Sequence, residues 1–275
     1  NKAGYDWTQL FIGSEGTLGV VTRVLLALQP AVTGTQTALC AAGSVANALA
    51  ALNRLEARLG GGLLAFEAMW SEYMTAAIEK VGLPAPFAEQ PEVVLVIEAA
   101  MGPGSAGEET FAEALAELAE EGLLDDALIA QSGRDRQRFW AYREANYEFY
   151  RELPTGVHFD VSIPLGAMAD AIALLRQRVK ARSNTAIPIV FGHLADSNLH
   201  LSIHDQTGDL SGFADIVYEL VREKQGSISA EHGVGVLKRP YLGMSRSDAE
   251  LALMTTLKRT LDPGNILNRG RILPA

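Results

Sequence analysis

The chain has 275 residues, of which 48% are hydrophobic, 20% charged and 7% aromatic, as is usual for a globular protein. Disordered, collagen-like and coiled-coil sequences are thereby excluded. A net charge of −10 argues against a broad nucleic-acid-binding surface, and the apolar runs are shorter than the ~20 residues of a membrane helix. The single cysteine, Cys40, excludes an intrachain disulfide framework and fits a reducing compartment.

Strand and helix patterns alternate along the chain. A strand is predicted at 20–28, after a glycine-rich loop at 13–19. Further strands are predicted at 35–41, 63–68, 93–100, 127–130, 158–163, 187–193 and 199–204. Helices are predicted at 45–59, 71–81, 108–121, 135–153, 165–181, 209–224 and 248–261. This order, with at least one hairpin, predicts an α+β fold with βαβ-type units in one main domain.

Two histidines, His193 and His200, flank the turn-forming residues 195–198. If those four residues form a hairpin loop, the histidines lie opposite each other with Cβ atoms about 4.5–5.5 Å apart. Two imidazoles so placed can bind one divalent ion, and Glu231 would add a third ligand that leaves positions open for a substrate. His232 could then serve as a general base, a role that imidazole side chains commonly take near neutral pH. The alternatives are a solvated hairpin face and an ordinary exposed loop.

An aromatic and basic stripe follows at helical spacing, with Trp140, Arg143, Tyr147 and Tyr150 on one side. Its arginine can bind a substrate carboxylate with the guanidinium fork, or it can stack on the rings and pair with a neighbouring glutamate. His204 shares the strand face of His200 and lies far from the loop, which favours a surface role.

A dinucleotide-binding pattern also occurs. Residues 102–107 fit G-x-G-x-x-G after a predicted strand, with acids near the position expected for ribose binding. Pro103, however, removes a backbone N–H from the phosphate cradle. A nicotinamide-dependent dehydrogenase is therefore the least favoured alternative.

Four long segments resemble the FAD-linked oxidases of the vanillyl-alcohol-oxidase superfamily. They are GYDWTQLFIGSEGTLGVVT (4–22), GHLADSNLHL (192–201), GSISAEHGVGVLK (226–238) and LDPGNILNRGRIL (261–273). The branch they are most similar to is the D-2-hydroxyacid dehydrogenases, which include D-2-hydroxyglutarate and D-lactate dehydrogenases and the flavin subunit of glycolate oxidase. The resemblance implies a ferredoxin-like substrate (cap) domain with an antiparallel sheet and flanking helices at 31–225. A C-terminal remnant of the FAD-binding domain is expected at 1–30, and a segment that carries the Glu-His pair toward the flavin at 226–275.

The resemblance also implies roles for individual residues. The expected ligands of a divalent metal, zinc or manganese, are His193, His200 and Glu231. His232 becomes the general base beside the flavin. The expected substrate-binding residues are Arg143, Tyr147 and His158. The residues expected near FAD are Gly13, Ser14, Glu15, Gly16, Thr17, Gly19 and Asn268. Most of the FAD site is expected in a flavin-binding half that this chain lacks, without which the fragment would be inactive.

The implied reaction is oxidation of a D-2-hydroxy acid to the 2-oxo acid, with hydride transfer to FAD. The branch acting on 2-hydroxyglutarate commonly has a lysine in place of His158, a small hydroxyl residue in place of Tyr147 and an amide in place of Ser202. A histidine is only partly charged near pH 7, and a tyrosine narrows the pocket. We therefore expect a different or smaller 2-hydroxy acid as substrate.

The resemblance leaves the electron acceptor open between an electron-transfer flavoprotein, a quinone and a cytochrome, and it is compatible with a homodimer. It suggests a cytoplasmic protein or one at the periphery of the inner membrane. Two further alternatives fit the same residues. One is a metal- or ligand-binding module without redox chemistry, and the other is a zinc hydrolase that uses His193, His200 and Glu231.

Overall fold

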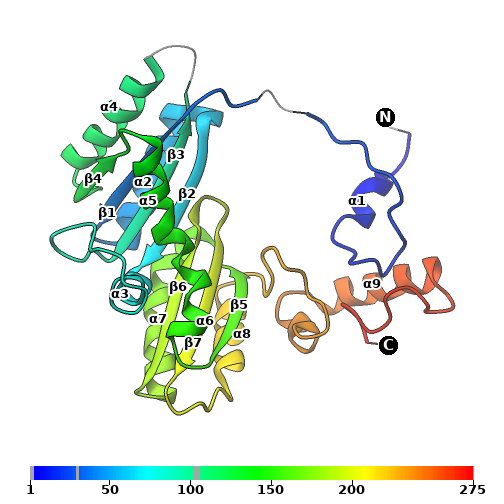
Figure 1. Ribbon diagram of the computed structural model, residues 1–275. Coiled ribbons are helices and arrows are strands. Elements are labelled where there is room, and N and C mark those ends of the chain that lie inside the picture. The colour runs from blue at the N-terminus through cyan, green and yellow to red at the C-terminus, as the bar shows by residue number, and fades with distance from the viewer. Residues whose placement is uncertain (1–2, 29–30, 102–105, 275) are drawn as a thin grey trace.

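The computed structural model describes residues 3–28, 31–101 and 106–274 (Figure 1). Its centre is a seven-stranded sheet with the order β4-β1-β3-β2-β6-β7-β5, and every neighbouring pair is antiparallel. The strands are β1 (Thr35–Ala42), β2 (Leu63–Trp70), β3 (Val93–Ala100), β4 (Asp126–Ile129), β5 (Gly156–Ser162), β6 (Ala186–His193) and β7 (Asn198–Asp205).

Helices flank this sheet and continue beyond it. They are α1 (Trp7–Phe11), α2 (Val45–Leu59), α3 (Ser71–Glu79), α4 (Ala106–Glu120), α5 (Gly133–Glu144), α6 (Phe149–Glu152), α7 (Met168–Arg182), α8 (Phe213–Glu223) and α9 (Asp248–Leu261). None of the helices in the described ranges has the length and apolar character needed to cross a membrane.

Two split βαβ units build the sheet. In the first, β1 and β2 lie on either side of β3, and β4 completes the order 4-1-3-2 of a ferredoxin-like unit. In the second, β5 and β6 lie on either side of β7, and α7 connects them. The predicted α+β fold with a ferredoxin-like antiparallel sheet is confirmed. The two units join through β2 and β6, which pair at Glu67↔His193, Ala68↔Gly192 and Met69↔Phe191.

Alternation along the strands divides the core between the two faces of the sheet. Side chains such as Cys40 of β1 and Phe66 of β2 pack with α2, α4, α7 and α8 on one face. On the other face, Leu39 of β1 and Met69 of β2 pack with α3, α5 and α6. The polar side chains of the candidate site project from this second face, between the strands and the segment that contains α5 and α6.

The predicted strand at 20–28 is wrong, because the structure has no regular element there. Its apolar side chains are largely exposed, and that of Leu25 is fully so. Among the described residues no strand lies beside this segment, so its backbone has no ladder partner. The residues before it, around Thr17, lie beside α9 (Figure 1), where Lys258 Nζ donates to the carbonyl oxygen of Thr17 over 2.9 Å.

The long helix predicted at 135–153 is also wrong, because α5 ends at Glu144 and a 3₁₀ turn, η2 (Ala145–Tyr147), precedes α6. The buried hydroxyl of Tyr73 causes the break. It accepts from the backbone N–H of Asn146 over 3.0 Å and donates toward the carbonyl oxygens of Tyr142 and Arg143. A side chain that inserts into the helical ladder in this way interrupts it. The dinucleotide-binding pattern at 102–107 lies mostly outside the described residues.

Candidate active site

One cleft of about 830 Å³ gathers the residues predicted for metal binding, catalysis and substrate binding. Those that line it are Arg143, Tyr147, His158, His193, His200, Glu231 and His232. They come from α5, η2, the strands β5, β6 and β7, and the loop after α8. Segments that are far apart in the sequence therefore meet on the second face of the sheet.

The predicted metal ligands His193, His200 and Glu231 are brought together. One ligand atom from each lies within 4.8 Å of the other two, and the two imidazole centroids are 5.3 Å apart. His193 Nε2 is 3.4 Å from Glu231 Oε1. The same carboxylate oxygen accepts from the side-chain amide of Asn198 over 2.5 Å. This donor set is of the kind that binds zinc or another divalent ion.

The predicted hairpin register is nevertheless wrong. His200 pairs with Phe191 rather than with His193, because a 3₁₀ turn and Ser197 in the left-handed region (φ +61°) connect the strands. A shift of two residues keeps a side chain on the same face of a sheet, so the two imidazoles still meet. Gly192 makes the tight connection feasible, because a Cβ at that position would lie 2.3 Å from the carbonyl oxygen of Asn198.

The buried carboxylate of Glu67 orients His193 through the ring nitrogen that faces away from Glu231. The Nδ1–H of His193 donates to Glu67 Oε1 over 2.5 Å, which leaves Nε2 facing Glu231. Burial alone would raise the pKa of Glu67, but the hydrogen bond from His193 and the charge of Arg143 outweigh burial and lower it. The hydrogen bond to Glu67 in turn raises the pKa of His193. A carboxylate–histidine pair of this kind orients imidazole ligands in metal sites.

His200 has the electrostatics of a neutral ligand. Desolvation lowers its pKa, and the nearby charges of Arg143 and His193 lower it further. A metal binds the neutral form of imidazole, so these surroundings keep His200 in the form that coordination requires.

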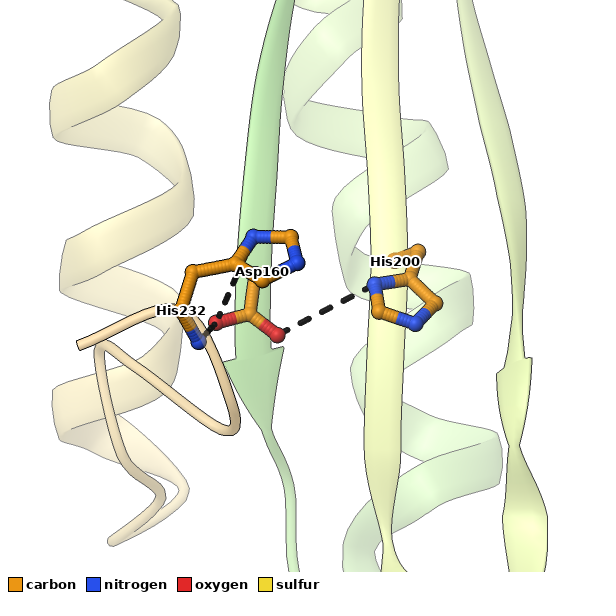
Figure 2. A group of neighbouring side chains, drawn as sticks. All are labelled: Asp160, His200 and His232. Atoms are coloured by element: carbon orange, nitrogen blue, oxygen red, sulfur yellow. Dashed lines mark hydrogen bonds and ion pairs between the residues drawn. The ribbon is translucent and has the colours of Figure 1, made fainter. Parts of the chain in front are cut away.

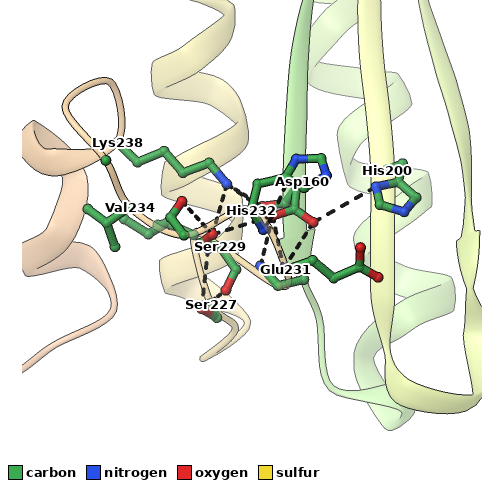
Figure 3. Close-up of polar contacts among 12 residues, drawn as sticks. Asp160, His200, Ser227, Ser229, Glu231, His232, Val234 and Lys238 are labelled. Atoms are coloured by element: carbon green, nitrogen blue, oxygen red, sulfur yellow. Dashed lines mark hydrogen bonds and ion pairs between the residues drawn. The ribbon is translucent and has the colours of Figure 1, made fainter. Parts of the chain in front are cut away.

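Asp160 organises the loop that carries Glu231 and His232 (Figure 3). Its carboxylate is almost fully buried and accepts from the backbone N–H groups of Ala230, Glu231 and His232 over 3.2, 3.1 and 2.9 Å. Lys238 Nζ donates to the same oxygen over 3.1 Å. Burial opposes ionisation of Asp160, but these hydrogen bonds and the lysine charge together lower its pKa.

A second group of potential ligands, Asp160, His200 and His232, lies beside the first (Figure 2). Asp160 Oδ1 is 3.8 Å from His200 Nδ1, and Oδ2 is 3.9 Å from His232 Nδ1. The carboxylate already accepts from three backbone N–H groups, and the ammonium group of Lys238 next to it would repel a cation. The group with Glu231 therefore fits a metal better.

His232 lies where a general base can reach a substrate. Its ring stacks against that of His200, with centroids 5.8 Å apart and an interplanar angle of 23°. The side chain is 65% exposed and faces the cleft. Its backbone N–H is held by Asp160, so the loop is fixed while the imidazole stays accessible.

The guanidinium group of Arg143 is held at Nε, whereas its two terminal nitrogens are free to bind a ligand. Its Nε donates to Glu67 Oε2 over 2.7 Å, and the guanidinium carbon lies 4.6 Å from the ring centroid of Phe191. Within the described residues, its two terminal nitrogens have no hydrogen-bond partner. They are therefore available to a carboxylate, which a guanidinium binds with two parallel hydrogen bonds.

The other predicted substrate-binding residues form one wall of the cleft. Tyr147 is mostly exposed, and the ring of Tyr150 lies 4.8 Å from that of His158. His204, next along the same face, is buried rather than at the surface, which corrects the sequence-based expectation. The Nδ1–H of His204 donates to the carbonyl oxygen of Pro154 over 2.7 Å, and the hydroxyl of Ser202 donates to its Nε2.

The residues predicted to line FAD lie together at the other side of the Glu-His loop. The carboxylate of Glu15 accepts from the backbone N–H groups of Val234 and Gly235 over 2.7 and 3.0 Å. The Asn268 side chain donates to the carbonyl oxygen of Glu15. The two predicted segments thus contact each other and the loop after His232, whereas their role in flavin binding stays a prediction.

Sequence reasoning missed Glu67, Asp160 and Lys238, although all three hold the predicted residues in place. A usable signal was present for the two acids, since Glu67 interrupts an otherwise apolar strand and Asp160 lies between the apolar residues Phe159 and Val161. Acids in such positions are buried, and a buried carboxylate requires partners. The partners themselves could not be identified, because the one that Glu67 holds is 126 residues away.

Comparison with known proteins identifies the family. The family model described as FAD linked oxidases, C-terminal domain, matches residues 33–272. The chain is similar to the mitochondrial D-2-hydroxyglutarate dehydrogenase of Bos taurus, with 36% identity over 100% of the chain and 50% of the relative. It is 31% identical to the D-2-hydroxyglutarate dehydrogenase of Stutzerimonas stutzeri, over 100% of the chain and 60% of that protein.

A solved structure of alkyldihydroxyacetonephosphate synthase shares the fold, with a TM-score of 0.63 and 14% identity over 98% of the chain and 50% of the synthase. This chain spans between half and three fifths of the curated relatives described above. The match over most of the chain, together with the shared fold, shows that the chain belongs to the FAD-linked oxidases and corresponds to their C-terminal domain.

Proposed function

We propose that this chain is the substrate- and metal-binding part of an FAD-dependent D-2-hydroxyacid dehydrogenase, which oxidises a D-2-hydroxy acid to the 2-oxo acid. The observation that carries the proposal is one cleft that combines a two-histidine, one-carboxylate donor set, the two unpaired terminal nitrogens of Arg143 and an accessible imidazole. In this proposal, residues 31–225 hold the substrate, and residues 1–30 and 226–275 approach the flavin.

The residues present fit a divalent metal. His193, His200 and Glu231 offer two imidazole nitrogens and a carboxylate oxygen, which suits zinc or manganese and leaves positions open for a substrate. The support of His193 by Glu67 is the arrangement expected around a metal-bound histidine.

The residues present fit one side of a flavin site. Glu15 and Asn268 link the glycine-rich segment to the loop that carries His232, so a cofactor placed beside them would adjoin the cleft. Exposed apolar side chains from Val20 to Leu28 also require a covering surface. FAD would be held mostly by the half of the relatives that this chain does not match.

In this proposal, separate residues of the chain bind the substrate and accept its proton. The free nitrogens of Arg143 bind the substrate carboxylate and fix the orientation of C2. His232 takes the proton of the 2-hydroxyl group as the C2–H bond breaks and the carbonyl forms. When bound, the metal supplies a Lewis acid and FAD accepts the hydride. A general base in such a position contributes about 10²–10⁴ in rate.

Metal content tests the donor set. The chain should contain close to one zinc or manganese ion per molecule by elemental analysis, and the His193→Ala/His200→Ala variant should lose it. His158→Ala, which removes a histidine outside the donor set, should retain the ion. Equal metal content in the parent and the double variant would contradict the assignment.

Turnover tests the base, in a protein that also contains the flavin-binding half. His232→Ala should lower kcat by about 10²–10⁴ and leave the metal content unchanged. Unchanged turnover would exclude His232 as the base. Ester or amide hydrolysis without flavin would instead indicate a metal-dependent hydrolase.

A further inference from the structure

We propose that the substrate is a 2-hydroxy acid with an aromatic side chain, of the 3-aryl-2-hydroxypropanoate class, whose ring stacks against Tyr147, Tyr150 and His158. We call these three residues the aromatic wall. The inference rests on the proposed function and extends it, because it specifies the part of the substrate that does not react.

Strand register places the aromatic wall next to the reacting end of the cleft. Across β6, β7 and β5, one row consists of Phe191, His200 and Asp160. The next row on the same face contains Ser202, two residues after His200, and His158, two residues before Asp160. Successive rows on one face are about 6.7 Å apart. A substrate whose C2 lies at the first row therefore directs its side chain at the second.

Of the side chains in that second row, His158 is the one that meets the cleft. Ser202 is buried and donates its hydroxyl hydrogen to His204 over 2.8 Å. His158, in contrast, lines the cleft, and the ring of Tyr150 lies 4.8 Å from its own at an angle of 35°. Tyr147, from η2, lines the same side. The surface offered to a substrate side chain is therefore made of rings.

The wall contains no permanent cation for a second carboxylate. Desolvation lowers the pKa of His158, and the neighbouring His204 lowers it further, which favours the neutral imidazole. Neutral ring surfaces favour a flat apolar group, which gains from stacking in addition to burial of its area. A distal carboxylate would gain no charged partner from these three side chains.

The cations elsewhere in the cleft are placed for other tasks. Arg143 is required for the carboxylate on C2. The ammonium group of Lys238 already contacts the side chain and the carbonyl oxygen of Asp160 and the hydroxyl of Ser229. Arg271 lines the cleft beside Gly235, and Gly235 belongs to the loop that follows His232 and not to the aromatic wall.

The test compares three substrates in a protein that also contains the flavin-binding half, with a dye as the final electron acceptor. We expect kcat/KM for D-3-phenyllactate to exceed the values for D-lactate and D-2-hydroxyglutarate by about tenfold or more. If no 2-hydroxy acid is oxidised, the proposed function itself fails. If 2-hydroxy acids are oxidised but D-lactate or D-2-hydroxyglutarate is preferred, the inference fails and the proposed function stands.

Variants locate the preference. Tyr150→Ala should lower the phenyllactate-to-lactate ratio of kcat/KM about tenfold. Arg151→Ala, which changes an exposed neighbour that contacts Glu148, should leave the ratio unchanged. His158→Lys should raise the kcat/KM for 2-hydroxyglutarate relative to phenyllactate, because it adds a cation to the wall. A ratio that Tyr150→Ala does not alter, or a 2-hydroxyglutarate preference that Arg271→Ala abolishes, would overturn the inference.

Discussion

Replacement of Asp160 by asparagine should destabilise the protein strongly, although the side chain keeps its size. The carboxylate is 2% exposed and accepts from three successive backbone N–H groups and from Lys238. An amide offers one acceptor oxygen in place of two, and it leaves the Lys238 ammonium group in a largely buried position without a counter-charge. Removing one member of a buried ion pair costs about 3–5 kcal/mol.

Urea unfolding of the chain measures this cost. The parent and Asp160→Asn should differ by about 3–5 kcal/mol in the free energy of unfolding. Asp170→Asn is the matched control, because Asp170 is exposed and pairs with Lys224 at the surface, where the loss should stay below about 1 kcal/mol. The Asp160→Asn/Lys238→Met double variant should recover part of the stability, since it removes the unpaired ammonium group.

Two results would refute this reasoning about Asp160. One is a loss below about 1 kcal/mol for Asp160→Asn, which would mean that the carboxylate contributes no more than a surface charge. The other is additivity of the two single substitutions in the double variant, because residues that form one network do not add.

Three further predictions concern other parts of the structure. Glu67→Gln should weaken metal binding about 10–100-fold in a competition titration, because the imidazole ligand loses its carboxylate support. Gly192→Ala should cost about 1–3 kcal/mol or more in urea unfolding, since its Cβ would collide with backbone. A hydrogen bond from the side chain of Lys258 lowers the pKa of Asp262 to about 2. Its contribution to stability is therefore complete above about pH 4 and lost as the pH falls towards 2, where Asp262→Asn and the parent should converge.

Each of these predictions has a control or a contrary outcome. Glu98→Gln changes another buried strand acid that lies outside the donor set, so metal affinity should be retained. Gly166→Ala adds a Cβ in open space and should leave stability nearly unchanged. Equal metal affinity of the Glu67 and Glu98 variants, or equal stability of the Gly192 and Gly166 variants, would contradict the two structural arguments. A constant gap between Asp262→Asn and the parent from pH 4 to pH 2 would contradict the third.

Local sequence predicts several elements of the fold well. The helices 45–59 and 248–261 and the strand 93–100 have the predicted bounds in the structure. Ser44 and Ser247 accept hydrogen bonds from the first turns of the two helices, so the start of each is encoded in adjacent residues. The strand is buried along nearly its whole length, which its apolar run from Val93 to Ile97 indicates.

Errors occur where a distant residue decides the outcome. The helix α5 ends at Glu144 because the hydroxyl of Tyr73, some seventy positions earlier, forms hydrogen bonds with the backbone groups of Arg143 and Asn146 that would otherwise continue the helix. The segment 20–28 has a strand pattern without a partner strand among the described residues. The turn before His200 has the predicted length of four residues but lies one position earlier, at 194–197 instead of 195–198. In each case the pattern is locally correct and tertiary contacts override it.

The candidate site divides in the same way. Spacing predicted that His193 and His200 meet, and the family resemblance added Glu231, because these residues lie in two short segments, 193–200 and 226–238. The supporting carboxylates, Glu67 and Asp160, were not identified because their contacts run between separate parts of the chain. No local pattern encodes such pairing.

The short ladder between β2 and β6 has a mechanical consequence. Among the described residues, three residue pairs join the two halves of the sheet there, and in the Glu67↔His193 pair at its end the supporting carboxylate meets the proposed metal ligand. An ion bound at the proposed site would thus be coupled to the first unit through the hydrogen bond between His193 and Glu67. Binding strength in the cleft and cohesion of the sheet depend on the same contact, so weakening either should weaken the other.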